Sequence, residues 1–277
     1  MTLNRTDIHY AFQSCDIRSY QNAKRFCGDD RTELSKKSLK SFLQSVLFCA
    51  EKNPNIFHNI LIVDDESSNE LKSFYRECQI QFSNEKIFID IFEMEKKSST
   101  SFTHQSYRNS LEKCYHWLQN SGKDLVYQIQ DDYIFLESAI FEMVDLFFQI
   151  KKETGSECII SPYNDSWNWL ALYRNKATPR VVVVGKKRYW IQYYDMSCTF
   201  MTSHNIFKDH WDLYYAFFEL MLKKVAGMME NRSLNYILSR RGVLGLVPLS
   251  SLAFHMQTDL DKDPHIDWKP LWDSIKI

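Results

Sequence analysis

The sequence predicts an α/β protein with a mostly parallel central sheet flanked by helices and a mixed second half. Over the first 160 of its 277 residues, short apolar runs alternate with segments of helical periodicity. Two of these runs end in paired acidic residues, and beyond residue 160 the apolar runs become shorter. Because parallel strands need long crossover connections, usually helices, this alternation favours a parallel sheet with right-handed crossovers.

The elements of the first half are predicted in the order strand, helix, strand. We expect strands at 8–14, 59–63, 87–92, 124–131 and 158–161. We expect helices at 33–51, 68–78, 107–118 and 138–152. In the first of these helices the apolar residues recur at helical spacing, and Ser67 and Ser68 are suitable caps for the second.

The second half reads as short strands and helices without a clear alternation. We expect strands at 180–184, 189–194, 198–201 and 243–247, helices at 212–226 and 231–240, and then a polar tail. No stretch has the composition of a linker, so we predict a single domain over residues 1–277.

Composition excludes several classes of function. With 34 Lys and Arg against 35 Asp and Glu, the net charge is -1. The chain therefore has no excess of basic residues of the kind that binds nucleic acid or a membrane surface. No apolar stretch is long enough for a membrane span, and the N-terminus does not resemble a signal peptide. The seven cysteines include no Cys-x-x-Cys, which fits a reducing compartment, so we expect a cytoplasmic protein.

Glycine is scarce, and none of the seven glycines lies in a Gly-x-Gly-x-x-Gly or P-loop pattern. Both patterns need glycine so that the backbone can approach phosphate closely. A nucleotide bound to this chain would therefore be held by a cation and side chains instead.

The two acidic pairs are the most informative feature of the chain. Asp131 and Asp132 end the fourth predicted strand, and Asp64 and Asp65 follow the second. Ligands of open α/β sheets bind outside the carboxyl ends of the strands. Two carboxylates there suit a divalent cation that holds phosphate oxygens. The alternative for each pair is a solvated turn.

Between the two pairs, Arg108 and Asn109 lie on the third predicted helix. The order strand-Asp-Asp-Glu-Ser, Arg-Asn, strand-Gln-Asp-Asp resembles glycosyltransferases of the GT-A fold, with a family-2-like, Asp-x-Asp-type pattern over residues 7–135. The resemblance implies a Rossmann-like sheet, a nucleotide-sugar-binding half at 1–135 and an acceptor-binding half at 136–277. It also implies a UDP-sugar donor and a Mn²⁺ or Mg²⁺ ion.

The resemblance implies roles for the Asp-Asp pair. Asp132 would be a metal ligand, and Asp131 beside it would contact the cation and the donor sugar or ribose. Gln130 stands where the family usually has an acid, so no role is carried over to it. The cation would neutralise the charge that develops on the leaving diphosphate.

Four further donor-binding residues follow from the same resemblance. Asp64 would accept the N3–H of a uracil, with capping of the next helix as its alternative role. Arg108 would lie near the base or the diphosphate, unless it is a helix-surface arginine. Gln13 and Asp16, at the end of the first strand, would lie beside the base and ribose.

Two later residues complete the predicted site. Glu230, before the helix at 231–240, matches the acid that serves as general base in inverting members, and its alternative role is a helix cap. His255 matches a C-terminal histidine that joins the metal shell in several GT-A families. The alternatives are that His265 takes that role, or that His255 is a packing residue.

The prediction is thus a metal-dependent glycosyltransferase that moves a sugar from a UDP-sugar to a saccharide, lipid or protein acceptor. A general base at Glu230 implies inversion at the anomeric carbon, and a retaining mechanism is the alternative. The alternatives are a sugar nucleotidyltransferase and a non-catalytic carbohydrate- or protein-binding module that kept the fold.

Overall fold

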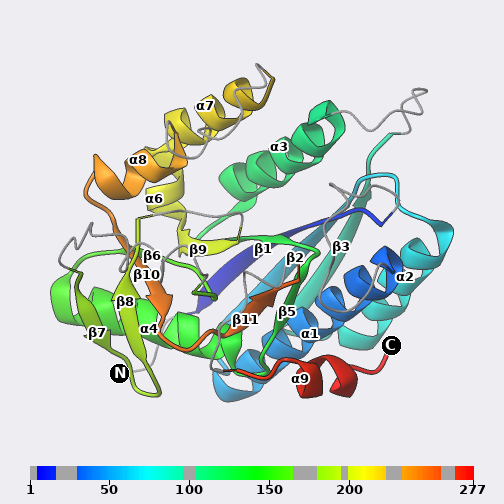
Figure 1. The fold of residues 1–277 in the computed structure, drawn as a ribbon, viewed down its shortest axis with the longest axis horizontal. Helices are drawn as coiled ribbons and strands as arrows, with labels where there is room; N and C mark the ends of the chain where they lie inside the picture. The colour runs from blue at the N-terminus through cyan, green and yellow to red at the C-terminus, as the bar shows by residue number, and fades with distance from the viewer. Residues whose placement is uncertain are drawn as a thin grey trace.

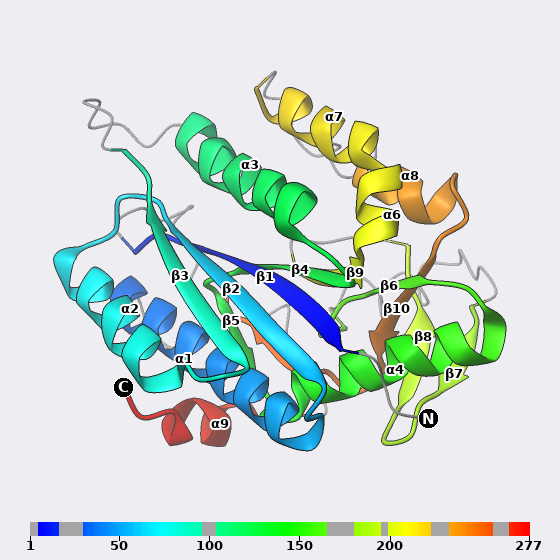
Figure 2. The same cartoon turned by 180° about the vertical axis from the view of Figure 1, so that it is seen from behind.

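A computed structural model describes residues 5–16, 30–95, 104–164, 180–194, 199–222, 233–256 and 266–277. Over these ranges the chain forms a nine-stranded sheet of order β3-β2-β1-β4-β9-β6-β10-β8-β7, with helices on both faces (Figures 1 and 2). A two-stranded ribbon, β11-β5, lies beside it. The predicted α/β class, with mostly parallel central strands flanked by helices, is confirmed.

The four long strands of the first half are parallel and close to their predicted positions. They are β1 (Thr6–Ser14), β2 (Ile56–Asp64), β3 (Ile87–Glu93) and β4 (Leu125–Gln130). In the register of the sheet, Ser14 lies opposite Asp64 and Gln13 lies opposite Gln130. The carboxyl ends of β1, β2 and β4 therefore meet at one edge, where both acidic pairs begin.

Helices cover the two faces of this sheet in separate layers. One face carries α1 (Arg31–Lys52), α2 (Asn69–Phe82) and α4 (Ala139–Thr154). The other carries α3 (His104–Ser121), α6 (His204–Asp209), α7 (Trp211–Leu222) and α8 (Leu234–Ser239). In Figure 1 the second layer lies above the sheet and the first below it.

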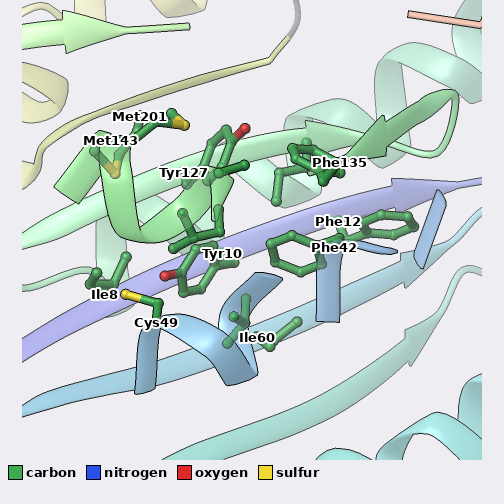
Figure 3. Packing of buried hydrophobic residues seen from close by; sticks show 14 of the residues in the cluster. Ile8, Tyr10, Phe12, Phe42, Cys49, Ile60, Tyr127, Phe135, Met143 and Met201 are labelled. Carbon is green, nitrogen blue, oxygen red and sulfur yellow. The ribbon is translucent and has the colours of Figure 1, made fainter. Parts of the chain in front are cut away.

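The core between the sheet and α1 is rich in aromatic rings (Figure 3). Ile8, Tyr10 and Phe12 alternate along β1, so all three point to this face, and each is fully buried. The rings of Tyr10 and Phe12 pack against Phe42 of α1, with centroids 5.4 and 5.8 Å away. This packing fixes α1 across β1 and places the start of α1 near the acidic edge.

The second half extends the same sheet with short strands of mixed direction. These are β6 (Cys158–Ile160), β7 (Val182–Val184), β8 (Tyr189–Gln192), β9 (Phe200–Ser203) and β10 (Leu244–Pro248). Strand β9 is antiparallel to both β4 and β6, and β10 is parallel to β6. The predicted mixed character of this half is confirmed. Helix α6, which the sequence did not predict, starts where Ser203 accepts a hydrogen bond from Ile206 N.

The prediction of a polar tail after residue 247 is wrong. Strand β11 (Ala253–His255) pairs with β5 (Tyr133–Phe135), and α9 (Lys269–Ser274) follows. Trp268 and Trp272 are buried there in a small apolar cluster with Phe254. Within the described ranges, no helix is long and apolar enough to cross a membrane.

Candidate functional site

The candidate site lies where β1, β2 and β4 end and the β5–β11 ribbon begins. Asp16, Asp64 and Asp131 are all buried at this edge, at 8%, 0% and 4% exposure. Asp132 follows directly and leads into β5. The two acidic pairs, far apart in the sequence, thus lie at one edge of the sheet, on either side of β1.

Both carboxylate oxygens of Asp131 are occupied by donors from the protein. Its Oδ2 accepts from Ser14 Oγ at 2.7 Å, Cys15 N at 2.9 Å and Ser35 Oγ at 2.7 Å. Its Oδ1 pairs with Arg31 Nη2 at 2.6 Å. Charge-assisted bonds of this kind are about twice as strong as neutral ones. Asp131 therefore ties the ends of β1 and β4 to the first turns of α1.

Arg31 is a site residue that the sequence did not reveal, because it lies between the predicted strand at 8–14 and the predicted helix at 33–51. Its Nε also donates to Cys15 O at 3.1 Å. Burial lowers the pKa of Arg31, but the charges of Asp131 and Asp132 outweigh it and leave the pKa raised. No local pattern marks this arginine, since its role depends on where α1 begins relative to β4.

Asp132 and His255 are brought together by the ribbon. His255 lies opposite Tyr133 in the register of β11 and β5, and Met256 N donates to Asp132 O at 2.8 Å. His255 Nε2 lies 3.2 Å from Asp132 Oδ2. The imidazole stacks on the Tyr133 ring at 4.5 Å between centroids and 8° between planes, which fixes its orientation. The predicted ligands, 123 positions apart in the sequence, are thus neighbours.

The chemistry of this pair fits a divalent cation such as Mn²⁺. A carboxylate oxygen and a neutral imidazole nitrogen are both ligands that Mn²⁺ accepts. Among the described residues no group of three or more His, Cys, Asp or Glu could hold a metal ion by itself. A cation here would therefore need water or phosphate oxygens to complete its shell, as is usual for cations that bind nucleotides.

Asp64 stabilises the turn that leads into α2, but the N-cap of that helix is Ser68 and not Asp64. Asp64 accepts from Ser67 N at 3.2 Å, and Lys72 Nζ lies 3.4 Å from its Oδ2. Burial raises the pKa of Asp64, and the bonds from Ser67 and the charge of Lys72 only partly offset this. Its contact with a uracil stays a prediction.

Asp16 joins the end of β1 to the starts of two helices. Its Oδ1 accepts from Ser68 N at 2.8 Å, and its Oδ2 accepts from Thr32 Oγ1 at 2.7 Å and from Ser68 Oγ. Ser68 is the N-cap of α2, as predicted, and accepts from Leu71 N. The described contacts of Asp16 therefore connect the end of β1 to the starts of α1 and α2.

Gln13 is one of the predicted donor-binding residues, and its side-chain amide is only partly hydrogen-bonded. Its Nε2 donates to Ser110 Oγ at 2.7 Å and to Tyr107 O at 3.0 Å. Its Oε1 is buried without a hydrogen-bond partner among the described residues. Ser110 Oγ also reaches Asp65 Oδ2 at 3.4 Å, and Gln130 donates to Tyr107 Oη. This polar group lies between β1 and α3, beside the acidic edge.

Arg108 faces another helix. Its Nη2 lies 3.4 Å from Glu112 on α3 and 3.8 Å from Glu219 on α7. These contacts match the alternative of a structural arginine, and a contact with a donor stays a prediction. Glu230 and His265 lie outside the described residues.

Comparisons with known proteins add a likeness in structure. No protein-family model and no curated protein matches the sequence. The chain is similar to apo UDP-glucose pyrophosphorylase at 10% identity and a TM-score of 0.47, over 92% of this chain and 94% of that one. It is also similar to an active-site mutant of LgtC at 10% identity and a TM-score of 0.41, over 84% and 70% of the two chains. Since both TM-scores lie below 0.5, neither likeness carries an argument about activity.

Proposed function

We propose that this protein is a metal-dependent glycosyltransferase that moves a sugar from a UDP-sugar to a saccharide, lipid or protein acceptor. One observation carries the proposal. Asp132 and His255, 123 positions apart in sequence, lie 3.2 Å apart at the carboxyl edge of the sheet. Open α/β sheets bind their ligands at this edge. The carboxylate and the imidazole would hold Mn²⁺ or Mg²⁺, whose charge would stabilise the leaving diphosphate.

The other residues of the edge would position the donor. The unpartnered Oε1 of Gln13 suits a donor group such as a base N–H. Asp131, which the resemblance assigns to the cation and the donor, would act mainly through Arg31, with which it pairs. Asp16 and Asp64 would shape the pocket through their bonds to the start of α2.

Glu230 would be the general base of an inverting transfer. Its carboxylate would accept the proton of the acceptor hydroxyl as that oxygen attacks the anomeric carbon. The measurement for this role is the rate of transfer by Glu230→Gln. A glutamine cannot accept the proton, so transfer should fall by about 10²-fold or more while donor binding is kept. An unchanged rate would mean that another residue is the general base.

The binding proposal is tested by thermal shift with UDP-, GDP-, CMP- and ADP-sugars, each with and without Mn²⁺. A ligand that binds only the folded state raises the melting temperature. We expect a rise with UDP-sugar only when Mn²⁺ is present, and loss of this rise in Asp132→Asn. The matched control is Asp273→Asn on α9, whose carboxylate pairs with Lys269 on the same helix. A UDP-sugar shift that is independent of metal and of Asp132 would contradict the proposal.

To separate the two alternatives, the panel is extended with nucleoside triphosphates and with carbohydrates. A sugar nucleotidyltransferase would be stabilised by a nucleoside triphosphate and would release pyrophosphate from it in the presence of a sugar phosphate. A binding module would respond to a carbohydrate or a protein without nucleotide or metal.

A further inference from the structure

Two buried polar side chains in the second half of the chain are not satisfied by the fold. Asn164 Oδ1 and Thr199 Oγ1 have no hydrogen-bond partner among the described residues. The two residues are exposed by only 3% and 0%. Because folded proteins pair the large majority of such atoms, these two need an explanation. Neither residue belongs to the predicted site.

The strand directions place both residues at the edge that carries the acidic pairs. Strand β9 is antiparallel to β4 and to β6, so β6 runs parallel to β4. Asn164 follows the end of β6, and Thr199 directly precedes β9, so both lie at the carboxyl edge. The sheet order is β4-β9-β6, and neighbouring strands are about 4.8 Å apart. The end of β6 therefore lies roughly 10 Å from the end of β4, where Asp132 follows.

Backbone contacts hold the two residues in place. Ser161 Oγ donates to Thr199 O at 3.0 Å, which joins the end of β6 to the start of β9. Asn164 N donates to Ser251 Oγ at 3.0 Å, which ties the segment after β6 to the segment before β11. These bonds use main-chain atoms of Asn164 and Thr199. The side-chain oxygens of both residues are thus positioned by the fold but not used by it.

The segment after β6 also contacts the ribbon pair. Pro162 O accepts from Leu252 N, directly before β11, at 2.7 Å. The ring of Tyr163 lies 6.0 Å from the ring of His255 and 5.1 Å from the ring of Tyr133, between centroids. The same short segment therefore packs on the histidine of the proposed metal site and carries the unpaired amide oxygen.

We propose that Asn164 and Thr199 bind hydroxyl groups of the sugar that the donor carries. This inference rests on the proposed function, in which a cation at Asp132 and His255 holds the diphosphate. A sugar attached to that diphosphate would extend along the edge from β4 toward β6. An amide oxygen accepts from a hydroxyl, and a threonine hydroxyl both donates and accepts. The pair is uncharged, which suits a neutral polyhydroxylated ring better than a further phosphate.

The test is the affinity for UDP and for UDP-sugars in the presence of Mn²⁺, measured by isothermal titration calorimetry. UDP-glucose, UDP-galactose and UDP-N-acetylglucosamine are compared in the unchanged protein, in Asn164→Ala and in Thr199→Val. Each variant should bind the preferred UDP-sugar about tenfold more weakly, because one hydrogen bond to the sugar is lost. Affinity for UDP should stay unchanged, because UDP carries no sugar.

The melting temperature separates sugar binding from a structural role. Valine has nearly the shape of threonine without the hydroxyl, so Thr199→Val removes an unpaired buried group. Its melting temperature should stay the same or rise. The matched control is Thr202→Val on the same strand, since Thr202 Oγ1 donates to Cys158 O at 3.1 Å. This control should melt at a lower temperature and keep its affinity for the UDP-sugar.

Three results would overturn the sugar-binding inference while the proposed function stands. One is an affinity for the UDP-sugar that neither variant changes. Another is an equal loss of affinity for UDP and UDP-sugar, which would mean that the variants distort the nucleotide site. The last is a lower melting temperature in Thr199→Val, which would give that hydroxyl a structural role. If the unchanged protein bound neither UDP nor any UDP-sugar, the proposed function itself would be wrong, and this inference with it.

Discussion

Two groups of titratable residues share the acidic edge, and their surroundings differ. The inner acidic cluster, Asp16, Asp64 and Asp131, is buried, and each carboxylate accepts a backbone N–H from a neighbouring segment. The ribbon pair, Asp132 and His255, lies on the adjacent β5–β11 ribbon, where the two side chains contact each other. One peptide bond separates Asp131 from Asp132, yet only Asp132 belongs to the ribbon pair.

The difference shows that acidic residues at strand ends divide into two kinds. A carboxylate whose oxygens are filled by protein donors satisfies the hydrogen bonding of its own fold. A carboxylate beside a histidine at the rim of the sheet is better placed to meet an incoming ligand. Changes in the inner acidic cluster should therefore lower stability first, and changes in the ribbon pair should lower ligand binding first.

The largest effect should come from Asp131→Asn. The amide keeps the shape but removes the charge, so Arg31 is left as a largely buried cation without its partner. Breaking a buried ion pair on one side costs about 4 kcal/mol. Urea unfolding should show this loss in Asp131→Asn, whereas Asp132→Asn should lose less than about 1 kcal/mol. Equal losses in the two variants would remove the distinction between the groups.

Acid stability should depend on a buried histidine. Burial lowers the pKa of His58 from 6.5 to about 3, and its Nδ1 shares a hydrogen bond with Tyr10. The folded state thus binds fewer protons than the unfolded state below pH 6.5. Stability should be complete above that pH and fall by about 3 kcal/mol on acidification to roughly pH 4.5.

The matched variant for this effect is His58→Gln, followed by urea unfolding at a series of pH values. The slope between pH 6.5 and roughly 4.5 should flatten. It should not vanish, because burial also lowers the pKa of His9, to about 4. An unchanged slope would exclude His58 as a source of the acid loss.

The ribbon pair should affect metal binding with little change in stability. His255→Gln keeps the backbone pairing of β11 with β5 but removes the imidazole. We expect its affinity for Mn²⁺, measured by titration with electron paramagnetic resonance, to fall about tenfold, or about 1.4 kcal/mol. His116→Gln, on the exposed side of α3, is the control. An unchanged affinity in His255→Gln would exclude this histidine from the shell.

The sequence predicted the long parallel strands because each is a continuous apolar run between turn residues. The run at 59–63 is an example, and β2 covers it with three more residues before and one after. Strands β5 and β11 have only three residues each and exist through their mutual pairing. No local pattern specifies such a pairing, so the ribbon and α9 could not be predicted in this way.

The site was predictable to a similar extent. The order of the acidic pairs placed Asp64 and Asp131 at one edge, because adjacent parallel strands end together. The division of Asp131 from Asp132 was not predictable, since it depends on Arg31 and Ser35 approaching from α1. That approach is set by the packing of Phe42 on β1, which is a tertiary contact.

The smallest effect should come from Ser68→Ala at the rim of the inner acidic cluster. Ser68 caps α2 and also donates to Asp16, so both contacts are lost together. Loss of a helix cap costs about 1 kcal/mol, which urea unfolding can detect. Ser73→Ala, exposed on the same helix, is the control and should be neutral or slightly stabilising. Affinity for Mn²⁺ should stay unchanged in Ser68→Ala, because Ser68 contacts the cluster and not the ribbon pair. A parallel loss of metal affinity would mean that the two groups act as one unit.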